Sequence, residues 1–239
     1  MSDLKEPINL NKNDKQDNKK KNVTKEILEW ILCIVIAIVL ALIFRYFIAT
    51  PTKVQKLSMF PTLKENDTLI LNKFTKTMKK EPKRGDIITF EAPSVDYVDE
   101  KDADMTHPVA VYENQLTGGI DKFLYYGLDI GKTTYIKRVI GLPGDHVEIK
   151  DNKVYLNGEI YNEPYLDSSV ITTPQNGIFY DLVVPDGYVF AMGDNRPNSK
   201  DCRHFGCVPF DKIEGTIWIR FWPLNKFGKI KWKNNIYFI

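Results

Sequence analysis

An uninterrupted apolar segment near the N-terminus places the strongest constraint on how this chain can fold. Residues 27–49 read ILEWILCIVIAIVLALIFRYFIA, and the charged residues among them, Glu29 and Arg45, lie near the two ends. At about 1.5 Å per residue, a helix of this length spans about 34 Å, which is enough to cross a hydrocarbon core of about 30 Å. We therefore expect residues 27–49 to form a transmembrane anchor.

A cleaved signal peptide is the competing interpretation of this segment. The apolar core of a signal peptide runs only about 7–15 residues, and the uncharged stretch 30–44 already reaches that upper limit. No small-x-small cleavage motif follows closely after it. We therefore favour an anchor that the mature protein retains, which makes the lipid bilayer a partner of the chain.

The charges on the two sides of the anchor set its expected direction. Lysines cluster at 19–25 before it, whereas Arg45, Lys53 and Lys56 follow it. Basic residues favour the cytoplasmic side, so this modest excess predicts a single-pass protein of the cell membrane with a cytoplasmic N-terminus. Residues 1–26 are rich in Lys, Asn and Asp, a composition that predicts a disordered cytoplasmic tail.

Composition bounds the rest of the chain. With 239 residues, 43% apolar and 12% aromatic, the chain can form one packed domain at 50–239 beside the anchor. Seven of the 33 basic and five of the 31 acidic residues lie in 1–26, so the remaining 213 residues carry 26 charges of each sign. Nucleic-acid-binding domains usually carry a strong basic surplus, so no nucleic acid is expected as a partner.

Strand signals dominate the segment after the anchor. Asp151-Asn152 is a favourable hairpin turn between two of the strand-like runs, and 72–80 could form a short helix. We expect a mainly β fold, an N-terminal transmembrane helix followed by an antiparallel β domain on the extracytoplasmic face. Within it, the acidic segment 92–133 is expected to be a surface insertion and 146–185 a hairpin or cap region. The strand-like runs are 68–71, 86–90, 146–150, 153–156, 188–192 and 213–221.

Three cysteines give limited information. Cys33 lies in the apolar segment, so a disulfide could form only between Cys202 and Cys207, and two free or half-buried thiols are an equally good interpretation. Cys202, His204 and Cys207 are too close together for a standard zinc site. We expect no metal and no cofactor.

Ser58 is a candidate nucleophile close to the bilayer. It follows the end of the apolar segment, near Ile48, by ten residues, which reach at most about 33–36 Å when extended. A serine hydroxyl needs an adjacent base. Three histidines are present, His107, His146 and His204, but no Gly-x-Ser-x-Gly elbow accompanies them. A histidine-based triad therefore has no support in the sequence.

Lys137 is a candidate base. In a strand, Tyr135, Lys137 and Val139 would share one face, while Arg138 would point the opposite way. Burial between apolar neighbours lowers the pKa of a lysine, and a decrease from about 10.4 to about 8 corresponds to about 3 kcal/mol. A lone lysine in a strand is more often a surface residue, so this pattern by itself does not establish a base.

Four blocks of sequence follow the anchor in a fixed order. They are Ser58-Met59-x-Pro61-Thr62-Leu63, Arg84-Gly85-Asp86, Lys137-Arg138-Val139-Ile140-Gly141-Leu142-Pro143-Gly144-Asp145, and Gly193-Asp194-Asn195-Arg196 with Ser199, Asp201, Arg203 and Gly206. In this order the chain resembles the type I signal peptidases, membrane-bound Ser-Lys proteases that remove signal peptides from exported proteins. The resemblance covers roughly residues 27–221, and the last two blocks are long and specific.

The resemblance implies roles for individual residues. Ser58 would be the nucleophile, Lys137 the general base, and Ser199 the second serine, whose hydroxyl orients the Lys137 amine. The backbone N–H of Ser58 is the implied oxyanion donor, and Met59 would pack beside the site. Structural support of the 193–206 loop is implied for Asp194, Arg196, Asp201 and Arg203, with Arg138.

Two positions depart from the family pattern. Lys56 stands two residues before the nucleophile, where many relatives have Gly or Ser, so a serine side chain cannot complete the oxyanion hole there. Cys202 replaces the usual serine between Asp201 and Arg203. Neither departure removes Ser58 or Lys137.

The resemblance also implies a substrate. Exported preproteins would be cut after small-x-small (Ala-x-Ala-like) sequences by a protein that is expected to be monomeric. The extended peptide would add to strand edges near Lys53–Leu57 and Thr134–Lys137.

Two other classes of function remain open. A sortase-like cysteine transpeptidase would use Cys202 or Cys207 with His107 and an arginine, but its Thr-Leu-x-Thr-Cys context is missing. A catalytically inactive, membrane-tethered β module is the other, and such a relative should have lost Ser58 or Lys137.

Overall fold

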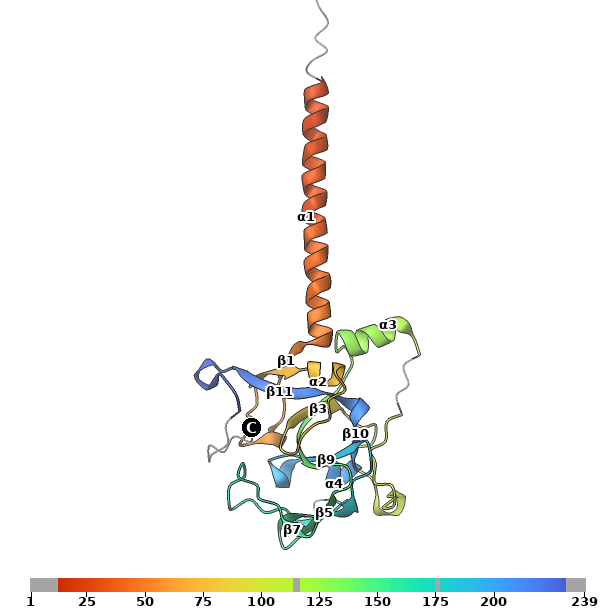
Figure 1. Cartoon of the computed structure of the whole chain (residues 1–239), viewed down its shortest axis with the longest axis vertical. Coiled ribbons are helices and arrows are strands. Elements are labelled where there is room, and N and C mark those ends of the chain that lie inside the picture. Colours follow the sequence, from red (N-terminus) through yellow and green to blue (C-terminus); the bar gives the residue numbers. More distant parts are fainter. Residues whose placement is uncertain (1–12, 114–116, 175–176, 231–239) are drawn as a thin grey trace, which may run out of the picture. The chain divides into compact units, whose positions relative to one another are not determined.

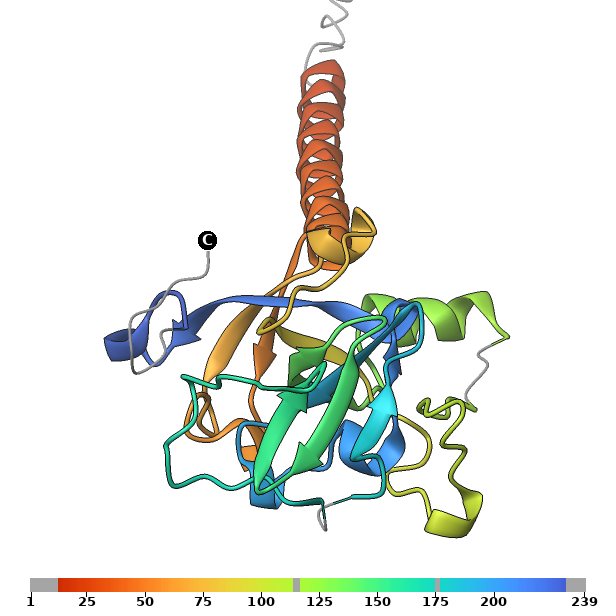
Figure 2. The same cartoon turned by 60° about the horizontal axis from the view of Figure 1, so that its bottom comes forward.

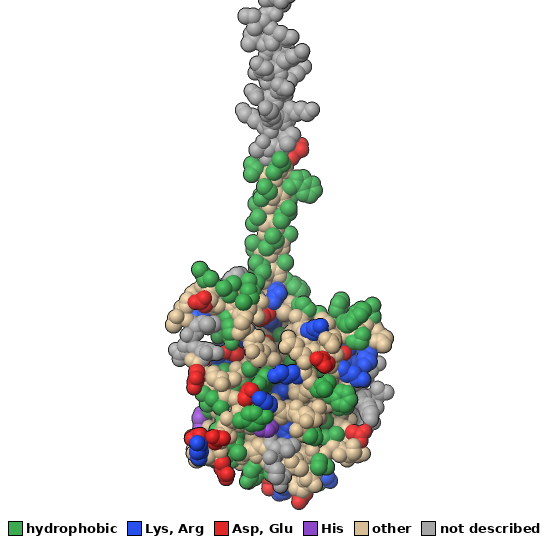
Figure 3. All heavy atoms as spheres, turned by 180° about the vertical axis from the view of Figure 1, so that it is seen from behind, with side chains coloured by type: hydrophobic (Ala, Val, Ile, Leu, Met, Phe, Trp, Pro, Cys, Tyr) green, Lys and Arg blue, Asp and Glu red, His purple; other side chains and the backbone are tan. Residues whose placement is uncertain are grey.

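The computed structural model describes residues 13–113, 117–174 and 177–230. The chain divides into two compact units, Met1–Phe44 and Arg45–Ile239, which are described separately. Helix α1 extends over Asn13–Phe47 (Figure 1). Its segment Lys25–Phe47 has a mean hydropathy of 3.1 and is long and apolar enough to cross a membrane. Hydrophobic side chains cover its visible surface in Figure 3, which is consistent with a membrane anchor.

The disordered tail predicted at residues 1–26 can be compared with the structure only at residues 13–26. Residues 1–12 lie outside the described part of the chain, whereas residues 13–26 continue α1 as helix. Adding a residue to an existing helix needs no new nucleus, and Lys and Glu are good helix formers. The polar composition of this segment therefore gave the wrong local prediction for residues 13–26.

The second unit is mainly β, as predicted. Within the described residues, a seven-stranded sheet has the order β1-β2-β11-β3-β4-β9-β10 and a four-stranded sheet has the order β7-β6-β5-β8 (Figures 1 and 2). All pairings between these named strands are antiparallel. The strands are β1 Ala49–Lys53, β2 Thr68–Asn72, β3 Ile87–Glu91, β4 Thr134–Gly141, β5 His146–Lys150, β6 Lys153–Leu156, β7 Glu159–Ile160, β8 Asp181–Val183, β9 Tyr188–Met192, β10 Val208–Pro209 and β11 Ile213–Trp222.

Helical elements in this unit are short. The predicted helix within 72–80 is present only as α2, Phe74–Thr77. The others are α3 Gly119–Lys122, α4 Cys202–Phe205, a π-helical turn at Phe123–Gly127, and 3₁₀ turns at Leu57–Met59, Glu100–Asp102, Arg196–Asn198, Phe210–Lys212 and Leu224–Lys226.

The predicted strands are confirmed, and the alternation of their side chains explains the core. The hairpin of β5 and β6 turns at Asp151 and Asn152, whose positive φ angles of 49° and 61° suit a two-residue hairpin turn. The larger hydrophobic cluster draws side chains from both sheets. Its fully buried members include Ile88, Phe90, Val139, Ile140, Val147, Val189, Phe190, Phe205 and Val208.

A smaller hydrophobic cluster supports the segment after β1. It contains Val54, Met59, Leu63, Leu69 and Ile87. Burial of Met59 and Leu63, at 1% and 0% exposure, fixes the chain on both sides of Phe60. This cluster therefore determines the position of Ser58 relative to the large sheet.

The segment 92–133 is not confined to the surface. Its described parts, 92–113 and 117–133, contain no strand beyond one isolated bridge, between Val109 and Cys207. Nevertheless Ala110 is buried, and Val98 and Tyr112 pack against the larger cluster. The N–H of Ala110 donates to the carbonyl of Cys207 at 2.9 Å. The acidic residues of this segment predicted a surface insertion, and its composition did not indicate these apolar contacts.

Candidate active site

Ser58 lies in the 3₁₀ turn Leu57–Met59 and is half-buried. Two hydrogen bonds attach this turn to the 193–206 loop. The Asn195 side-chain amide donates to the Leu57 carbonyl at 3.0 Å, and the Asn195 backbone N–H donates to the Ser58 carbonyl at 3.0 Å. Together with the buried Met59 next to it, these bonds fix the backbone of the serine.

Lys137 lies in β4, opposite Ile88 of β3. Its Nζ lies 2.8 Å from Ser58 Oγ, within hydrogen-bonding distance, although the two residues are 79 positions apart in the sequence. Lys137 is only 3% exposed. Burial lowers the pKa of its amine from 10.5 to about 8, and the nearby Asp201 carboxylate opposes this decrease.

Ser199 lies close to Ser58 but does not contact Lys137 through a hydrogen bond. It is 4% exposed, and its hydroxyl has no hydrogen-bond partner within the described residues. A Cβ on Gly193 would lie 2.1 Å from Ser199 Oγ and 2.4 Å from the Ser58 carbonyl oxygen, so only glycine fits between these two serines. The hydrogen bond between Ser199 and Lys137 that the resemblance implies is therefore not formed in this structure, in which the amine contacts Ser58 Oγ.

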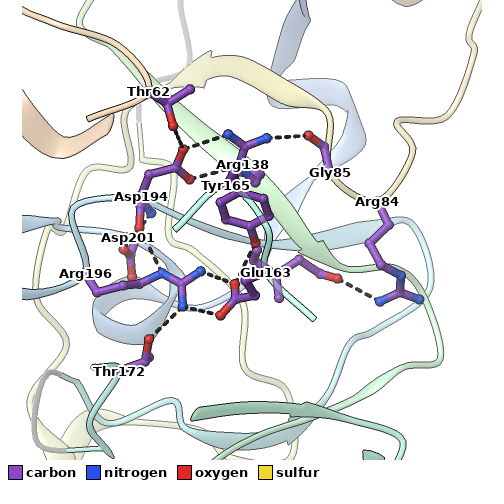
Figure 4. Close-up of polar contacts among 12 residues, drawn as sticks. Thr62, Arg84, Gly85, Arg138, Glu163, Tyr165, Thr172, Asp194, Arg196 and Asp201 are labelled. Carbon is purple, nitrogen blue, oxygen red and sulfur yellow. Dashed lines mark hydrogen bonds and ion pairs between the residues drawn. The ribbon is translucent and has the colours of Figure 1, made fainter. Parts of the chain in front are cut away.

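Asp194 joins the two segments that carry Ser58 and Lys137 (Figure 4). Its carboxylate accepts two hydrogen bonds from Arg138, from Nε at 2.9 Å and from Nη2 at 2.7 Å. It also accepts a hydrogen bond from the hydroxyl of Thr62. Arg138 follows Lys137 directly, and Thr62 lies four residues after Ser58. One buried carboxylate therefore fixes both segments relative to the 193–206 loop.

The guanidinium of Arg138 makes two contacts besides its pair with Asp194. Its Nη1 donates to the Gly85 carbonyl at 3.0 Å, which brings in the Arg84-Gly85-Asp86 block. Its guanidinium carbon lies 3.9 Å from the centroid of the Tyr165 ring, a favourable cation–π geometry. These contacts satisfy a fully buried guanidinium, whose position opposite the Lys137 face agrees with the predicted alternation of β4.

The other charged residues of the loop form separate pairs. Arg196, completely buried, pairs with Glu163 and also donates to the Thr172 hydroxyl at 2.7 Å (Figure 4). Arg203 pairs with Asp201 at 2.8 Å. The sequence grouped the four charged residues of the loop together but did not indicate their partners. Glu163 and Tyr165 lie outside the four blocks. Thr62 lies in the first block, but no pattern in the sequence gives its hydroxyl a polar role.

Asp201 is an anion at the end of α4 nearest the site. It caps the helix by accepting a hydrogen bond from the Arg203 backbone N–H, and it accepts another from the Gly193 N–H at 2.9 Å. Burial raises the pKa of this carboxyl, but the Arg203 guanidinium and the hydrogen bonds outweigh burial and lower it to about 2. Asp201 is therefore ionised at neutral pH.

A cleft of about 520 Å³ reaches Ser58 and Lys137. Residues 50–59 line it on one side and residues 133–137 on another. Thr134–Lys137 pair with β3 alone, since β9 pairs with β4 only from Arg138 onward. Strand β1 pairs with β2 alone. Within the described residues, both strand segments therefore present an edge without a β partner to the cleft.

The cysteines do not form a site of their own. All three are free, and Cys202 and Cys207 are completely buried. Burial raises the pKa of both thiols, which makes them poor nucleophiles. In the described part of the chain, no group of three or more His, Cys, Asp or Glu residues could hold a metal ion.

Comparisons with known proteins identify the family. Residues 27–222 match the family model described as "Signal peptidase, peptidase S26", and the chain belongs to this family. It is 35% identical over 191 residues to "Probable signal peptidase I-1" of Synechocystis sp., covering 79% of each chain. It is 33% identical over 195 residues to "Signal peptidase I T" of Bacillus subtilis, covering 79% of this chain and 82% of the relative.

A solved structure is also similar. It is that of a signal peptidase I from Enterococcus faecalis, at 30% sequence identity and a TM-score of 0.36, and the match covers 57% of this chain and 97% of that one. The family identified from the sequence blocks is thereby confirmed by the family model and the curated relatives, and the chain is a signal-peptidase-family peptidase with an apolar N-terminal helix.

The Arg138–Asp194 pair should stabilise the fold strongly. Arg138→Met would leave the Asp194 carboxylate buried without its main partner, and we expect a loss of about 3–5 kcal/mol in the free energy of unfolding. Thermal unfolding of the full-length protein in detergent measures the change. Lys101→Met is the control, because Lys101 pairs with Asp99 at an exposed position and such pairs contribute about 0–1 kcal/mol. Equal losses in the two variants would contradict the assignment.

Proposed function

We propose that this chain is a membrane-bound serine endopeptidase that removes N-terminal signal peptides from exported preproteins, with Ser58 as nucleophile and Lys137 as general base. Family membership supports the removal of signal peptides. The observation that carries the mechanism is the distance of 2.8 Å between Lys137 Nζ and Ser58 Oγ at a place where the amine is buried.

The chemistry follows from the two groups. Neutral Lys137 Nζ accepts the proton of Ser58 Oγ as the oxygen attacks the scissile carbonyl carbon. The oxyanion is stabilised by the backbone N–H of Ser58. When the C–N bond breaks, the Lys137 ammonium returns its proton to the leaving amine, and the signal peptide remains as an ester on Ser58. Lys137 then takes a proton from water as the water oxygen attacks the ester carbonyl carbon. When the bond between that carbon and Ser58 Oγ breaks, the Lys137 ammonium returns the proton to Ser58 Oγ, and the signal peptide leaves with a free carboxyl group.

Ser199 keeps its proposed role as the residue that orients Lys137. Its buried hydroxyl has no other partner within the described residues, and a buried hydroxyl without a hydrogen bond is unfavourable. In the proposed role, the Ser199 hydroxyl accepts a hydrogen bond from one N–H of the Lys137 amine. The Lys137 lone pair would then point toward Ser58 Oγ.

We propose that the cleft binds the substrate as an added strand. The segments Lys53–Leu57 and Thr134–Lys137 line the cleft beside Ser58; β1 ends at Lys53, so 54–57 continue from this strand edge without being part of the strand, whereas Thr134–Lys137 belong to β4. Backbone hydrogen bonds to strand edges bind an extended peptide regardless of its sequence. Selection for small-x-small residues would come from shallow pockets that exclude large side chains. The family resemblance is the basis for this preference.

The proposed location follows from the anchor. Residues 27–49 would hold a monomeric enzyme in the cell membrane, with the tail 1–26 in the cytoplasm and domain 50–239 on the extracytoplasmic face. The lysines at 19–25 support this direction. The substrate would then present its cleavage site on the same side of the bilayer as Ser58.

The two rival functions have less support. A cysteine transpeptidase needs an accessible thiolate, whereas Cys202 and Cys207 are buried with raised pKa values. An inactive relative should have lost one of the two reacting groups, yet Ser58 and Lys137 are both present and in hydrogen-bonding contact.

Removal of either reacting group should abolish cleavage. We expect Ser58→Ala and Lys137→Met each to reduce the kcat of reporter preprotein cleavage by at least about 10³-fold. Sequencing of the product N-terminus identifies the cleavage site in the wild type. Near-normal turnover by Lys137→Met would contradict the assignment of the base.

Lys137→Met also tests burial of the amine through stability. The pKa of the Lys137 amine is about 8 in the fold and 10.5 in the absence of burial, so the unfolded chain binds the proton more tightly. The protonated lysine therefore destabilises the fold by about 3 kcal/mol below pH 8, and this loss disappears above pH 10.5. At pH 7, Lys137→Met should unfold at a higher temperature than the wild type, and so its inactivity could not be attributed to misfolding.

Activity should depend on pH through Lys137. Only the neutral amine is a base, so kcat/KM should rise about tenfold per pH unit below pH 8 and level off above it. At pH 7, about one molecule in ten would carry the neutral amine. Initial rates between pH 6 and pH 10 measure the profile, and rates that do not change over this range would contradict it.

Thiol reagents should leave the native enzyme active. In a Cys33→Ser background, we expect iodoacetamide to label Cys202 and Cys207 only after denaturation, since both are buried. Mass spectrometry locates the label while cleavage of a preprotein is assayed in parallel. Loss of activity in proportion to labelling at either residue would instead favour a cysteine mechanism.

A further inference from the structure

Two lysine side chains lie near one aromatic ring beside Ser58. Lys137 Nζ is 5.2 Å from the centroid of the Tyr135 ring, and Lys56 Nζ is 5.8 Å from the same centroid. The two amines are therefore at most about 11 Å apart. Tyr135 itself is fixed, because its hydroxyl donates to Asp96 at 2.6 Å. Lys56 is the residue that departs from the family pattern.

The two lysines have different environments. Lys137 is 3% exposed, whereas Lys56 is exposed on the wall of the cleft. An exposed lysine is a hydrated cation at neutral pH. The face of an aromatic ring attracts cations, so the Lys56 ammonium is held near Tyr135, on the same side of the cleft as the buried amine.

The charged groups around Lys137 come from several elements. Asp201 at the start of α4 favours the protonated amine, as does the Cys202 thiol if it ionises, and Arg203 and Lys56 disfavour it. Arg138 points away from Lys137 and pairs with Asp194. Because Arg203 pairs with Asp201, its charge is largely balanced. Lys56 forms no ion pair in the described part of the chain. The carboxylate of Asp96 is close enough to interact with its charge, but Asp96 already pairs with Lys200 at 2.9 Å and accepts from the Tyr135 hydroxyl, so the Lys56 charge is only partly balanced.

We propose that Lys56 is a positioning residue of the proposed Ser-Lys site: its ammonium beside Tyr135 repels a proton on Lys137, so that the amine next to Ser58 is more often free to accept the serine proton. This inference rests on the proposed function and adds a residue that acts through Lys137 without contact to the reacting atoms. The effect of Lys56 on the Lys137 pKa, which it lowers, has the same sign.

Removal of the Lys56 charge should shift the pH profile of cleavage. Two unit charges about 11 Å apart shift a pKa by about 0.3 unit in bulk water and by about 1 unit at the effective dielectric constant of a protein surface, and about half a unit lies between these values. For Lys56→Met in the full-length protein, we expect the rising part of kcat/KM to move to higher pH by about 0.5 unit. Relative to wild type, the variant would therefore lose about threefold more activity at pH 7 than above pH 9.5.

A charge series and a matched control separate this effect from others. Lys56→Arg should keep the wild-type profile, and Lys56→Glu should shift it further than Lys56→Met. Lys64→Met removes another exposed cation from the segment after Ser58, but Lys64 lies near the Phe60 ring, not the Tyr135 ring, and should leave the profile unchanged. Salt at 1 M should reduce the difference between wild type and Lys56→Met, because it screens an exposed charge.

The outcomes distinguish this inference from the proposed function. If Lys137→Met is inactive but Lys56→Met keeps the wild-type profile, the role of Lys56 is wrong and the Ser-Lys mechanism stands. A loss for Lys56→Met that is equal at every pH would also overturn it, because that result indicates a contact with the substrate. If Lys137→Met is active, the proposed mechanism itself fails.

Discussion

The contact between a buried amine and the hydroxyl of Ser58 is the feature on which the rest of the site depends. Lys137 Nζ lies 2.8 Å from Ser58 Oγ and is almost completely removed from water. Burial disfavours the charged form of the amine, which is the condition for a lysine to act as a base near neutral pH. The buried Lys137 amine destabilises the fold when it is protonated, and strongly perturbed pKa values of this kind cluster at functional sites.

The surrounding structure maintains this contact with charges that are themselves fully paired. Asp194 binds both Arg138, the neighbour of Lys137, and Thr62, on the segment that carries Ser58. Asn195 binds the turn at Ser58 directly. Gly193 is packed so closely that a Cβ would contact both serines. The 193–206 loop therefore acts as a rigid support, and a displacement of about 1 Å would separate Lys137 Nζ from Ser58 Oγ.

The sequence predicted the strands and the pair Ser58 and Lys137 because both leave local signals, namely alternation in the strands and contiguous blocks. It did not predict partners that only tertiary packing brings together, such as Glu163 for Arg196 or Thr62 for Asp194. Local composition was also misleading where packing or helix extension decides the outcome. Residues 13–26 form helix despite their polarity, and Ala110 is buried within a segment whose acids indicated a surface insertion.

Direct titration of Lys137 tests the central claim most clearly. The full-length protein, labelled with ¹⁵N at lysine Nζ and held in detergent micelles, would be followed by NMR between pH 6 and pH 11, and the Lys137 signal would be assigned by its absence in Lys137→Met. The account predicts a titration midpoint for Lys137 near pH 8, well below that of a hydrated lysine. A midpoint near 10.4, the value of a hydrated lysine, would contradict the claim that a buried, neutral amine activates Ser58.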